Sequence, residues 1–316
     1  MPKTRTETGA KEPIVSVVVP CYNSERTIRQ CLQAITNQQT SVDFEVIAVD
    51  SSTDETPSII AAEFPQVRLI HLDRRTHAGA ARNIGMRESR SPYCLMIDSD
   101  CVARPDLIEL VVERHNEDSY AAVGGSLRNG TPGSLSGLIG YLLEFKEFMP
   151  STPMRTETNV PTANLCYRRE ALKSFGGFDE ELRLAEDILL NWKISASGER
   201  ILFDPEIEVT HLNRTGWKTV LTYQIDLGRY SARARARGHL PGAWLLRFPA
   251  LILLLPIMRT YRALAWLARY DRRLFIVFLL AWPLYLLGTC FWSYGFFLEA
   301  KRMVEDFQSA RSRPDI

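Results

Sequence analysis

Two carboxylates follow a short apolar run and could bind a metal ion together. Asp98 and Asp100 come directly after Tyr93–Ile97, whose length and composition predict a buried strand. Side chains two residues apart on a strand point the same way, so both acids can approach one hard divalent cation and a bound phosphate. Parallel sheets bind ligands beyond the carboxyl ends of their strands, which favours this position. The alternative is a solvated turn at the strand end.

Two earlier strand ends carry groups that suit a nucleoside. The first predicted strand runs into Pro20, Tyr22 and Glu25, and the second ends at Asp50. Tyr22 can pack on a base, while Asp50 or Glu25 can accept hydrogen bonds from base or ribose donors. The sequence has no glycine-rich phosphate loop of either common type, which argues against kinases, ATPases and dehydrogenases.

Further side chains could bind a diphosphate, a proton or a metal. Arg82 lies among small residues in His77–Gly85, a pattern that predicts a closely packed helix start, and it could offer charge to a diphosphate. Glu186 and Asp187 open an apolar helix. The helix dipole would explain them, but a partly desolvated carboxylate there could also act as a general base. His211 ends a late β-rich run and is either structural or part of an octahedral Mn²⁺ or Mg²⁺ shell.

The elements that must position these groups alternate between β-rich runs and helical patterns. This alternation predicts an α/β fold with a mixed, mostly parallel sheet. After the first nine such elements, the segment around 138–161 is interpreted as an insertion or mobile flap. The predicted elements are, in chain order, Ile14–Val19, Glu25–Asn37, Phe44–Val49, Pro57–Phe64, Val67–Leu72, Gly79–Arg87, Tyr93–Ile97, Pro105–Asn116, Ala121–Gly125, Ala163–Tyr167, a helix from about Ala185 to Ser197, Ile201–Phe203 and Ile207–His211.

The small net charge hides an uneven distribution. The 316 residues carry a formal charge of +1, and 46% of them are hydrophobic, which is enough for one sizeable domain with an appendage. Between Asn213 and Arg273, twelve Lys and Arg stand against two acids, so this block carries +10 and the remainder −9. A basic block beside apolar segments indicates an anionic lipid surface rather than nucleic acid, because no nucleic-acid recognition motif accompanies it.

The C-terminal third predicts membrane association. Trp217–Arg237 has the pattern of an interfacial amphipathic helix, with a solvated basic helix as the alternative. Phe248–Met258 is apolar but too short to span, so we expect it to be re-entrant or interfacial. Leu274–Leu298 has 25 residues without a charge and is long enough to cross a membrane, unless it is a buried core helix.

These patterns divide the chain into five regions. We expect a disordered leader at 1–13, a catalytic domain at 14–212, a basic amphipathic or interfacial helical region at 213–273, a transmembrane helix at 274–298 and a polar tail at 299–316. The leader lacks an apolar core, which argues against a secretory signal peptide. The basic flank before Leu274 and the cysteines in apolar surroundings predict a catalytic domain that faces the cytosol. Basic residues in the tail would also fit a hairpin that returns to the cytosol.

Taken in order, the motifs closely resemble those of the family 2 glycosyltransferases. The resemblance covers about residues 14 to 212 and rests on Val18–Asn23, Val49–Asp54, Gly79–Gly85, Asp98–Asp100, Gly176–Asp179 and Glu186–Asp187. It implies a GT-A fold, a UDP- or GDP-sugar donor and inversion at the anomeric carbon. The roles that it implies are Pro20, Tyr22, Glu25 and Asp50 on the nucleoside, Arg82 and Asp98 near ribose and diphosphate, Asp100 with Asp98 and His211 on the metal, and Asp187 beside Glu186 as the catalytic base.

Two departures from the family pattern bear on function. The turn after Asp50 is one residue shorter than the commonest family form and lacks its second acid. Processive members carry a Gln-x-x-Arg-Trp motif, whereas this chain has Gln224–Tyr230 with a different spacing. The second departure predicts addition of a single sugar rather than synthesis of a polymer.

The expected function is therefore inverting transfer of one sugar to a lipid-linked or other membrane-associated acceptor, such as a glycolipid. Mg²⁺ or Mn²⁺ would neutralise the departing diphosphate, Asp187 would take the acceptor proton, and Asn164 could meet donor or acceptor hydroxyls. One alternative is a catalytically silent membrane scaffold that binds nucleotide. Another is a nucleotidyltransferase, which needs a basic, glycine-rich triphosphate loop, and Pro20–Arg29 is not one.

Overall fold

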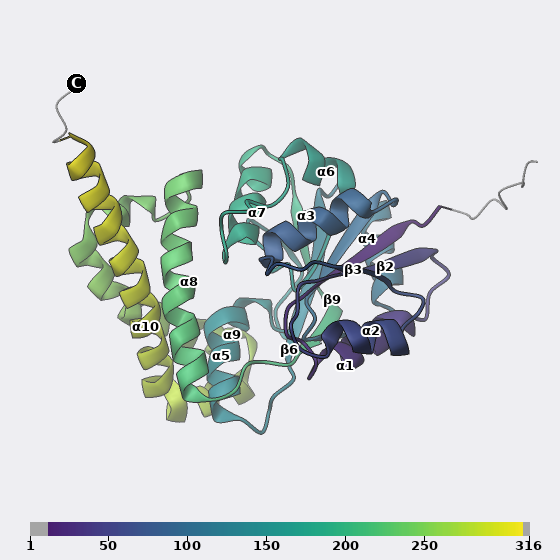
Figure 1. Cartoon of the computed structure of the whole chain (residues 1–316). Coiled ribbons are helices and arrows are strands. Elements are labelled where there is room, and N and C mark those ends of the chain that lie inside the picture. The colour runs from purple at the N-terminus through teal and green to yellow at the C-terminus, as the bar shows by residue number, and fades with distance from the viewer. Residues whose placement is uncertain (1–11, 312–316) are drawn as a thin grey trace, which may run out of the picture.

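The structure is a computed structural model that describes residues 12–311, and it has two parts that lie side by side (Figure 1). One part is a β-sheet with helices packed against it. The other is a group of helices from the C-terminal third of the chain, and α5 (Leu135–Phe145) packs with this group. The α/β architecture that the alternating pattern predicts is confirmed. Nearly all of the expected leader lies outside the described residues.

The sheet of the described chain has the strand order β3-β2-β1-β4-β8-β6-β9-β5, with β7 paired to β9. Strands β1, β2, β3, β4, β6 and β9 run in one direction and β5, β7 and β8 in the other, so the sheet is mixed and mostly parallel. The strands are β1 (Val15–Cys21), β2 (Phe44–Asp50), β3 (Arg68–His71), β4 (Tyr93–Ile97), β5 (Cys101–Ala103), β6 (Ala122–Asn129), β7 (Arg155–Glu157), β8 (Asn164–Arg168) and β9 (Ile201–His211).

Continuous apolar runs form the central strands because both of their faces are buried. Val17, Val18 and Leu95 are fully buried, and α3 and α1 lie on opposite sides of the sheet (Figure 1). The helices of this part are α1 (Ile28–Thr36), α2 (Thr56–Glu63), α3 (Ala78–Glu88), α4 (Leu107–Glu117), α6 (Arg169–Ser174) and α7 (Glu186–Ala196).

The antiparallel strand β8 brings a second chain segment to the carboxyl edge of the parallel strands. Ile97, the last residue of β4, pairs with Asn164, the first residue of β8. The residues that precede β8, including Thr162, therefore lie beside the end of β4. Sequence patterns identify the strand but not its direction, so this neighbourhood is visible only in the fold.

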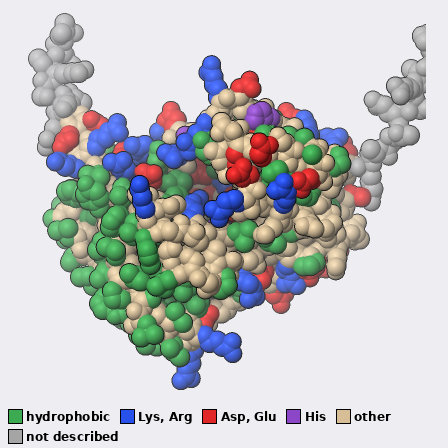
Figure 2. Space-filling model, turned by 60° about the horizontal axis from the view of Figure 1, so that its bottom comes forward, with side chains coloured by type: hydrophobic (Ala, Val, Ile, Leu, Met, Phe, Trp, Pro, Cys, Tyr) green, Lys and Arg blue, Asp and Glu red, His purple; other side chains and the backbone are tan. Residues whose placement is uncertain are grey.

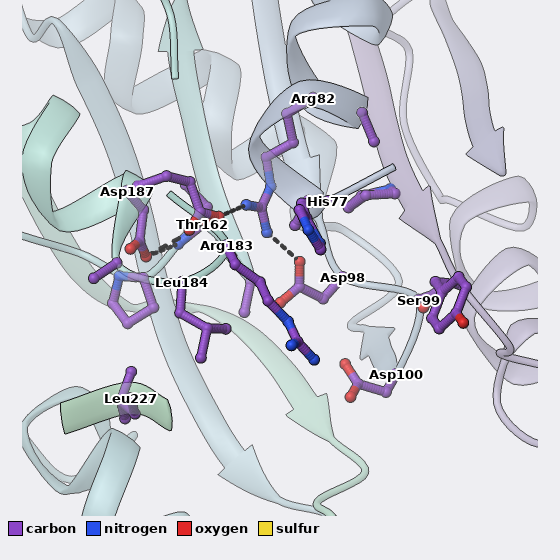
Figure 3. Close-up of a pocket in the computed structure, with 18 of the residues that line it drawn as sticks. His77, Arg82, Asp98, Ser99, Asp100, Thr162, Arg183, Leu184, Asp187 and Leu227 are labelled. Atoms are coloured by element: carbon purple, nitrogen blue, oxygen red, sulfur yellow. Dashed lines mark hydrogen bonds and ion pairs between the residues drawn. The ribbon is translucent and has the colours of Figure 1, made fainter. Parts of the chain in front are cut away.

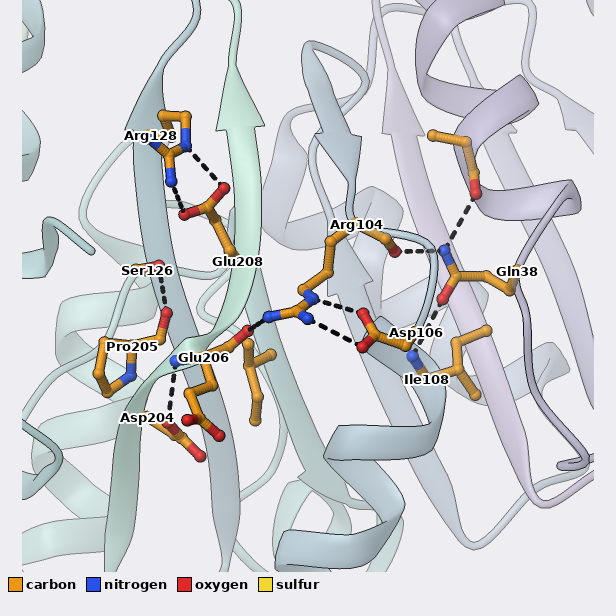
Figure 4. A network of polar contacts seen from close by, with 12 residues as sticks. Gln38, Arg104, Asp106, Ile108, Ser126, Arg128, Asp204, Pro205, Glu206 and Glu208 are labelled. Atoms are coloured by element: carbon orange, nitrogen blue, oxygen red, sulfur yellow. Dashed lines mark hydrogen bonds and ion pairs between the residues drawn. The ribbon is translucent and has the colours of Figure 1, made fainter.

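A polar network holds β9 against its neighbouring strands (Figure 4). The two predicted strands Ile201–Phe203 and Ile207–His211 form this single strand. The pairing of β6 with β9 shifts register after Gly125, at a bulge that Pro205 and Glu206 accommodate. Ser126 Oγ donates to Pro205 O (2.8 Å), and Arg104 Nη1 donates to Glu206 O (2.6 Å). These contacts hold the end of β9 in register with β5 and β6, where His211 pairs with Cys101 and Asn129.

The second part of the molecule is built around one long helix. Helix α10 packs along α8 and also contacts α9 and α5. Two glycines allow a close approach: an added Cβ would lie 2.0 Å from Trp292 O at Gly228 and 2.0 Å from Ile225 O at Gly295. The elements are α5, η1 (Lys146–Phe148), α8 (Trp217–Gly238), η2 (Ala243–Arg247), η3 (Pro249–Leu254), α9 (Leu255–Tyr270) and α10 (Arg272–Arg311).

Several boundaries differ from the sequence-based expectation. The apolar stretch 248–258 is not an isolated piece, because η3 continues into α9 and the helical segment reaches Tyr270. Helix α10 runs through 274–298 and on to Arg311, so the expected polar tail is helical as far as the structure describes it. The expected flap is a packed helix, since Ile139 and Leu142 of α5 are buried in a core shared with α10.

Two helical segments of the described chain are long and apolar enough to cross a membrane. They are Pro249–Tyr270 and Arg272–Asp306, with mean hydropathy of 1.4 and 2.2. Length and composition alone identify them, and buried core helices can pass the same criteria. The exposure of their apolar side chains therefore helps to distinguish a membrane-crossing helix from a buried core helix. Leu253 and Leu280 are 76% and 85% exposed.

Candidate active site

A cavity of about 550 Å³ opens where the parallel strands β1 and β4 end (Figure 3). Residues from four of the six predicted motifs meet around it, together with residues from α5, α8 and the segment before β8. The polar side chains on its wall include Tyr22, Arg75, His77, Arg82, Asp98, Asp100, Glu144, Asn159, Thr162, Arg183, Glu186, Asp187, Arg214 and Tyr223.

Arg82 connects two of the predicted acidic motifs. Its Nη1 donates to Glu186 Oε1 and its Nη2 donates to Asp98 Oδ1, both at 2.6 Å. The Arg82 side chain is only 4% exposed, whereas Asp98 is 32% exposed and faces the cavity. One buried guanidinium thus couples the end of β4 to the start of α7.

Small residues and an unusual backbone conformation make this contact possible. Ala185 adopts a left-handed conformation with φ of 64°, which turns the chain into α7 immediately before the acid pair. At Gly79, an added Cβ would lie 3.0 Å from Glu186 Cγ, so a larger residue there would press on this side chain. Asn83 Nδ2 donates to Phe178 O (2.9 Å) and holds the loop that leads to α7.

Burial sets the protonation properties of the two acids that open α7. It raises the pKa of Glu186 and the pKa of Asp187 above the ordinary carboxyl range, although the charge of Arg82 acts in the opposite direction on both. Asp187 accepts weak hydrogen bonds from Thr162 N and Thr162 Oγ1, each at 3.5 Å. Asp187 also accepts from Ile188 N (2.8 Å), but unlike Glu186 it is not ion-paired with Arg82.

A second cluster adjoins the cavity at Asp100. Asp100 Oδ1 is 3.5 Å from His211 Nε2, and ligand atoms of Asp100, Cys101 and His211 lie within 4.8 Å of one another. Burial raises the pKa of the Cys101 thiol, which keeps it protonated and a poor ligand for a hard cation. Cys101 was not among the predicted ligands.

The hydrogen bonds around His211 fix its tautomer. Thr131 N donates to Asn129 Oδ1 (3.0 Å), so this oxygen is an acceptor, and Asn213 Nδ2 donates to it (2.7 Å). Asn213 must then present Oδ1 to His211 Nδ1, which donates at 2.9 Å. The lone pair of Nε2 consequently faces the Asp100 carboxylate, and either a second proton or a cation must separate the two acceptors. These groups fit a divalent cation such as Mg²⁺ or Mn²⁺.

Tyr22 forms the outer wall of the cavity next to Pro20. The Tyr22 ring is 38% exposed, and the Arg75 guanidinium carbon lies 4.3 Å from the ring centroid. A base that packs on the free face of Tyr22 would have its ribose and phosphates directed toward Asp98 and Asp100, which line the same cavity.

Four predicted site residues do not line this cavity, and one of them is His211, which lines a small adjoining pocket with Glu144 and Arg214. Asp50 is fully buried, where its carboxylate accepts from Ser52 Oγ (2.5 Å) and pairs with His71 Nδ1 (2.6 Å). Glu25 is exposed beside α2 rather than at the cavity wall. Asn164 is also fully buried, and its Nδ2 donates to Ile207 O (2.8 Å), so it supports the β9 bulge instead of meeting a sugar hydroxyl.

The cavity wall includes residues that the sequence did not single out. Arg214 and Tyr223 belong to the region expected to be separate from the catalytic domain, yet both line the cavity. The Arg214 guanidinium carbon lies 4.2 Å from the centroid of the Tyr223 ring. The boundary at residue 212 therefore divides the site. Arg214 follows His211 by three residues, and this closeness to the end of β9 could have indicated from the sequence that Arg214 lies at the site.

The family model described as "Glycosyl transferase family 2" matches residues 16–176. The "Succinoglycan biosynthesis protein ExoO" of Rhizobium meliloti (strain 1021) is 34% identical over 220 residues, which cover 65% of this chain and 62% of that protein. The "Pre-mycofactocin glycosyltransferase" of Mycobacterium tuberculosis is 25% identical over 67% of this chain and 45% of its own length. The chain thus spans about half to two thirds of these relatives.

A solved structure supports the same assignment of the fold. The mannosyltransferase PcManGT from Pyrobaculum calidifontis, in complex with GDP-Man and Mn²⁺, aligns with a TM-score of 0.60 at 20% identity. The alignment covers 94% of this chain and 88% of that one, and it establishes a GT-A-like fold. The family model covers half of this chain, and it includes the β1 and β4 ends that line the cavity. The chain belongs to glycosyl transferase family 2.

Proposed function

We propose that this protein transfers a single sugar from a nucleoside-diphosphate sugar to a membrane-associated, lipid-linked acceptor, with inversion at the anomeric carbon. The observation that carries the proposal is the position of Asp187. Its carboxylate lines the same cavity as Asp100 and lies next to the Arg82–Glu186 ion pair. A carboxylate with raised proton affinity thus faces a site suited to a metal-bound diphosphate.

The donor side of the cavity supports binding of a uridine or guanosine diphosphate sugar. Tyr22 packs on the base, and Asp98 accepts hydrogen bonds from the ribose while Arg82 holds its carboxylate in place. A divalent cation on Asp100 and His211 would act as a Lewis acid toward the diphosphate. Asp98 takes the nucleotide rather than the metal, because its carboxylate is already directed to Arg82. Asp50 supports this wall from behind through Ser52 and makes no direct contact.

The acceptor side follows from the difference between the two acids of α7. Asp187 takes the proton of the acceptor hydroxyl as that oxygen forms its bond to the anomeric carbon, and the bond from this carbon to the diphosphate oxygen breaks. Attack from the face opposite the leaving group inverts the configuration. Glu186 is a positioning residue, because Arg82 occupies its carboxylate. Thr162 orients Asp187 through its two hydrogen bonds.

The relatives support the donor class in general terms. The solved mannosyltransferase is described as a complex with GDP-Man and Mn²⁺, and one relative is named for succinoglycan biosynthesis. The first description fits a nucleotide-sugar donor and a divalent metal, and the second fits a glycan as product. The cluster of acidic side chains around the cavity favours an enzyme over a silent scaffold that only binds nucleotide.

The apolar surface of the C-terminal helices supports membrane association. Figure 2 shows hydrophobic side chains gathered over this part of the molecule, with Lys and Arg side chains at its margins. Phe278, Tyr285 and Phe296 of α10 are fully buried against the protein, so α10 can meet lipid with one face only. Arg233 of α8 pairs with Glu299 of α10 at 2.8 Å, which would be costly at hydrocarbon depth. Glu299 follows the charge-free stretch 274–298 directly, so this pair fits a position at the membrane surface, and the proposal places the catalytic domain on the cytosolic side.

A panel of nucleotide sugars incubated with the full chain and a membrane lipid extract tests this function. The proposal predicts a lipid product that is one sugar heavier, as measured by mass spectrometry, with one donor preferred. Donor hydrolysis at the same rate with and without lipid, and no glycosylated lipid, would refute it.

A further inference from the structure

A second cavity adjoins the active site on the side of the apolar helices. It has a volume of about 280 Å³ and lies between η1, α9 and the segment that follows β7. Glu144, Phe148 and Asn159 line both this cavity and the catalytic one. The two spaces are therefore separated by a single layer of shared side chains.

Most charges in the second cavity are already paired. Glu147 lies 3.5 Å from Lys146 Nζ and 3.4 Å from Arg262 Nη2. Glu157 pairs with Arg155 at 2.5 Å. Glu144, the remaining acid, has its pKa raised by burial, which favours the neutral form. Arg259 is the cation of this cavity that makes no ion pair within the described chain, although the charge of Glu147 acts on it at longer range.

Arg259 has no carboxylate partner among the described residues. Its guanidinium carbon lies 4.2 Å from the centroid of the Trp292 ring on α10, and its buried Nε has no hydrogen-bond acceptor. The neighbours of Arg259 on the outer side of α9 are apolar, since Ile257 and Met258 are 65% and 55% exposed. An unpaired guanidinium in an apolar helix is costly and is a strong indication of an anionic ligand.

We propose that the second cavity binds the phosphate or diphosphate group of the lipid acceptor. This proposal rests on the proposed function, and it narrows the acceptor class to a phosphate-bearing lipid in place of a neutral glycolipid. Arg259 and Arg262 provide guanidinium donors that match phosphate oxygens, and Lys146 adds a third positive charge. The hydrocarbon chain would leave the cavity over the exposed apolar face of α9 and η3, on the surface seen in Figure 2.

The arrangement also gives the acceptor a direction. Asn159 contacts both cavities, and Thr162, three residues later, donates to Asp187. A phosphate at Arg259 would place the attached sugar across Asn159, with a hydroxyl near the Asp187 carboxylate. The lipid would therefore approach the catalytic cavity from the side opposite Tyr22, so that donor and acceptor do not compete for one wall.

Direct binding to the purified full chain in detergent tests the proposal without requiring turnover. The probes are a short polyprenyl phosphate, the matching polyprenol and inorganic pyrophosphate. Wild type should bind the lipid phosphate at least about tenfold more tightly than the alcohol, because one hydrogen bond to a charged group contributes at least about this factor to the affinity. Arg259→Gln should lose this preference, and Arg259→Lys should keep part of it. Arg269→Gln, on the same helix but outside the cavity, should match wild type.

Two results would overturn the proposal. One is equal binding of the lipid phosphate by wild type and by a folded Arg259→Gln variant. The other is binding of pyrophosphate alone, without displacement by the lipid phosphate, which would identify a site for a free anion. Nucleotide-sugar binding, measured on the same samples, separates this proposal from the proposed function. If wild type binds the donor but does not discriminate between the lipid phosphate and the alcohol, only the second site is contradicted, whereas absent donor binding in wild type contradicts the transferase proposal.

Discussion

Arg82 of α3 and Glu186 of α7, separated by 104 residues in sequence, form a buried ion pair with an Nη1–Oε1 distance of 2.6 Å. The second amino group of Arg82 holds Asp98 at the same distance. One side chain thus links the nucleotide side of the cavity to the acid pair on the acceptor side. In the proposed mechanism, this link gives Glu186 a positioning role and leaves Asp187 to accept the proton.

Replacement of Asp187 by Asn should reduce transfer by about three orders of magnitude or more, because the acceptor oxygen loses its general base. Donor binding should change by less than twofold, since Asp187 lies on the acceptor side. Calorimetric titration with the nucleotide and a turnover assay measure the two effects. Glu113→Gln, on an exposed surface of α4, is the matched control. Wild-type turnover by Asp187→Asn would remove it from the mechanism.

The rate of transfer should fall as the pH decreases. Asp187 acts only when it is deprotonated, and burial raises its pKa above the ordinary aspartate range. The acid limb of the pH–rate profile should therefore lie at higher pH than the titration of an ordinary aspartate, at about 3.9, with a slope of one. A transfer rate that stays constant as the pH is lowered to about 3.9, where an ordinary aspartate titrates, would contradict a base with raised proton affinity.

Arg82→Gln should destabilise the protein by about 3–5 kcal/mol, because Glu186 loses a buried partner and Asp98 loses its charged donor. Chemical denaturation at neutral pH measures this free energy of unfolding. Arg87→Gln changes a residue of the same helix that is 59% exposed and 3.8 Å from its acidic neighbour, so its effect should stay below about 1 kcal/mol. Equal effects of the two variants would argue against a structural link through Arg82.

Nucleotide binding should depend on a divalent cation and on its two proposed ligands. Chelation should weaken binding of the nucleoside diphosphate by about tenfold or more, and Asp100→Ala and His211→Ala should weaken it even when Mn²⁺ is present. His239→Asn, at an exposed histidine far from β9 in sequence, serves as the control. Unchanged affinity in Asp100→Ala would show that this carboxylate does not hold the metal.

Gly228→Ala and Gly295→Ala should each loosen the contact between α8 and α10. The added methyl group would overlap a backbone oxygen in either case, so a cost of about 1–3 kcal/mol is expected. Thermal unfolding of the two variants in detergent measures the loss. Gly133→Ala has open space around the added Cβ and should behave like wild type. Melting temperatures unchanged in both helix variants would contradict the close packing.

Local patterns predicted the sheet well because its strands are continuous apolar runs. Tyr93–Ile97 was predicted to the residue, and the strands that end near Tyr22 and Asp50 were found within two residues. The roles of the acids were harder to predict. That Asp50 faces Ser52 and His71 instead of the cavity depends on the loop after β2, and its direction has no periodic signal.

The limits of the site also depended on contacts that are distant in sequence. Arg214 and Tyr223 line the cavity because α8 docks beside the end of β9, whereas composition separated these residues from the catalytic domain. Thr162 lies near Asp187 because β8 runs antiparallel to β4. Strand direction and helix docking are decided by tertiary packing, so neither could be inferred from a single sequence.

The anomeric configuration of the sugar in the product tests the central claim most directly. The full chain, Mn²⁺, the preferred nucleotide sugar and a phosphate-bearing lipid acceptor should yield a product whose anomeric configuration, assigned by NMR coupling constants, is opposite to that of the donor. The Asp187→Asn variant should form no such product. A product that retains the configuration of the donor would contradict single-step displacement assisted by Asp187.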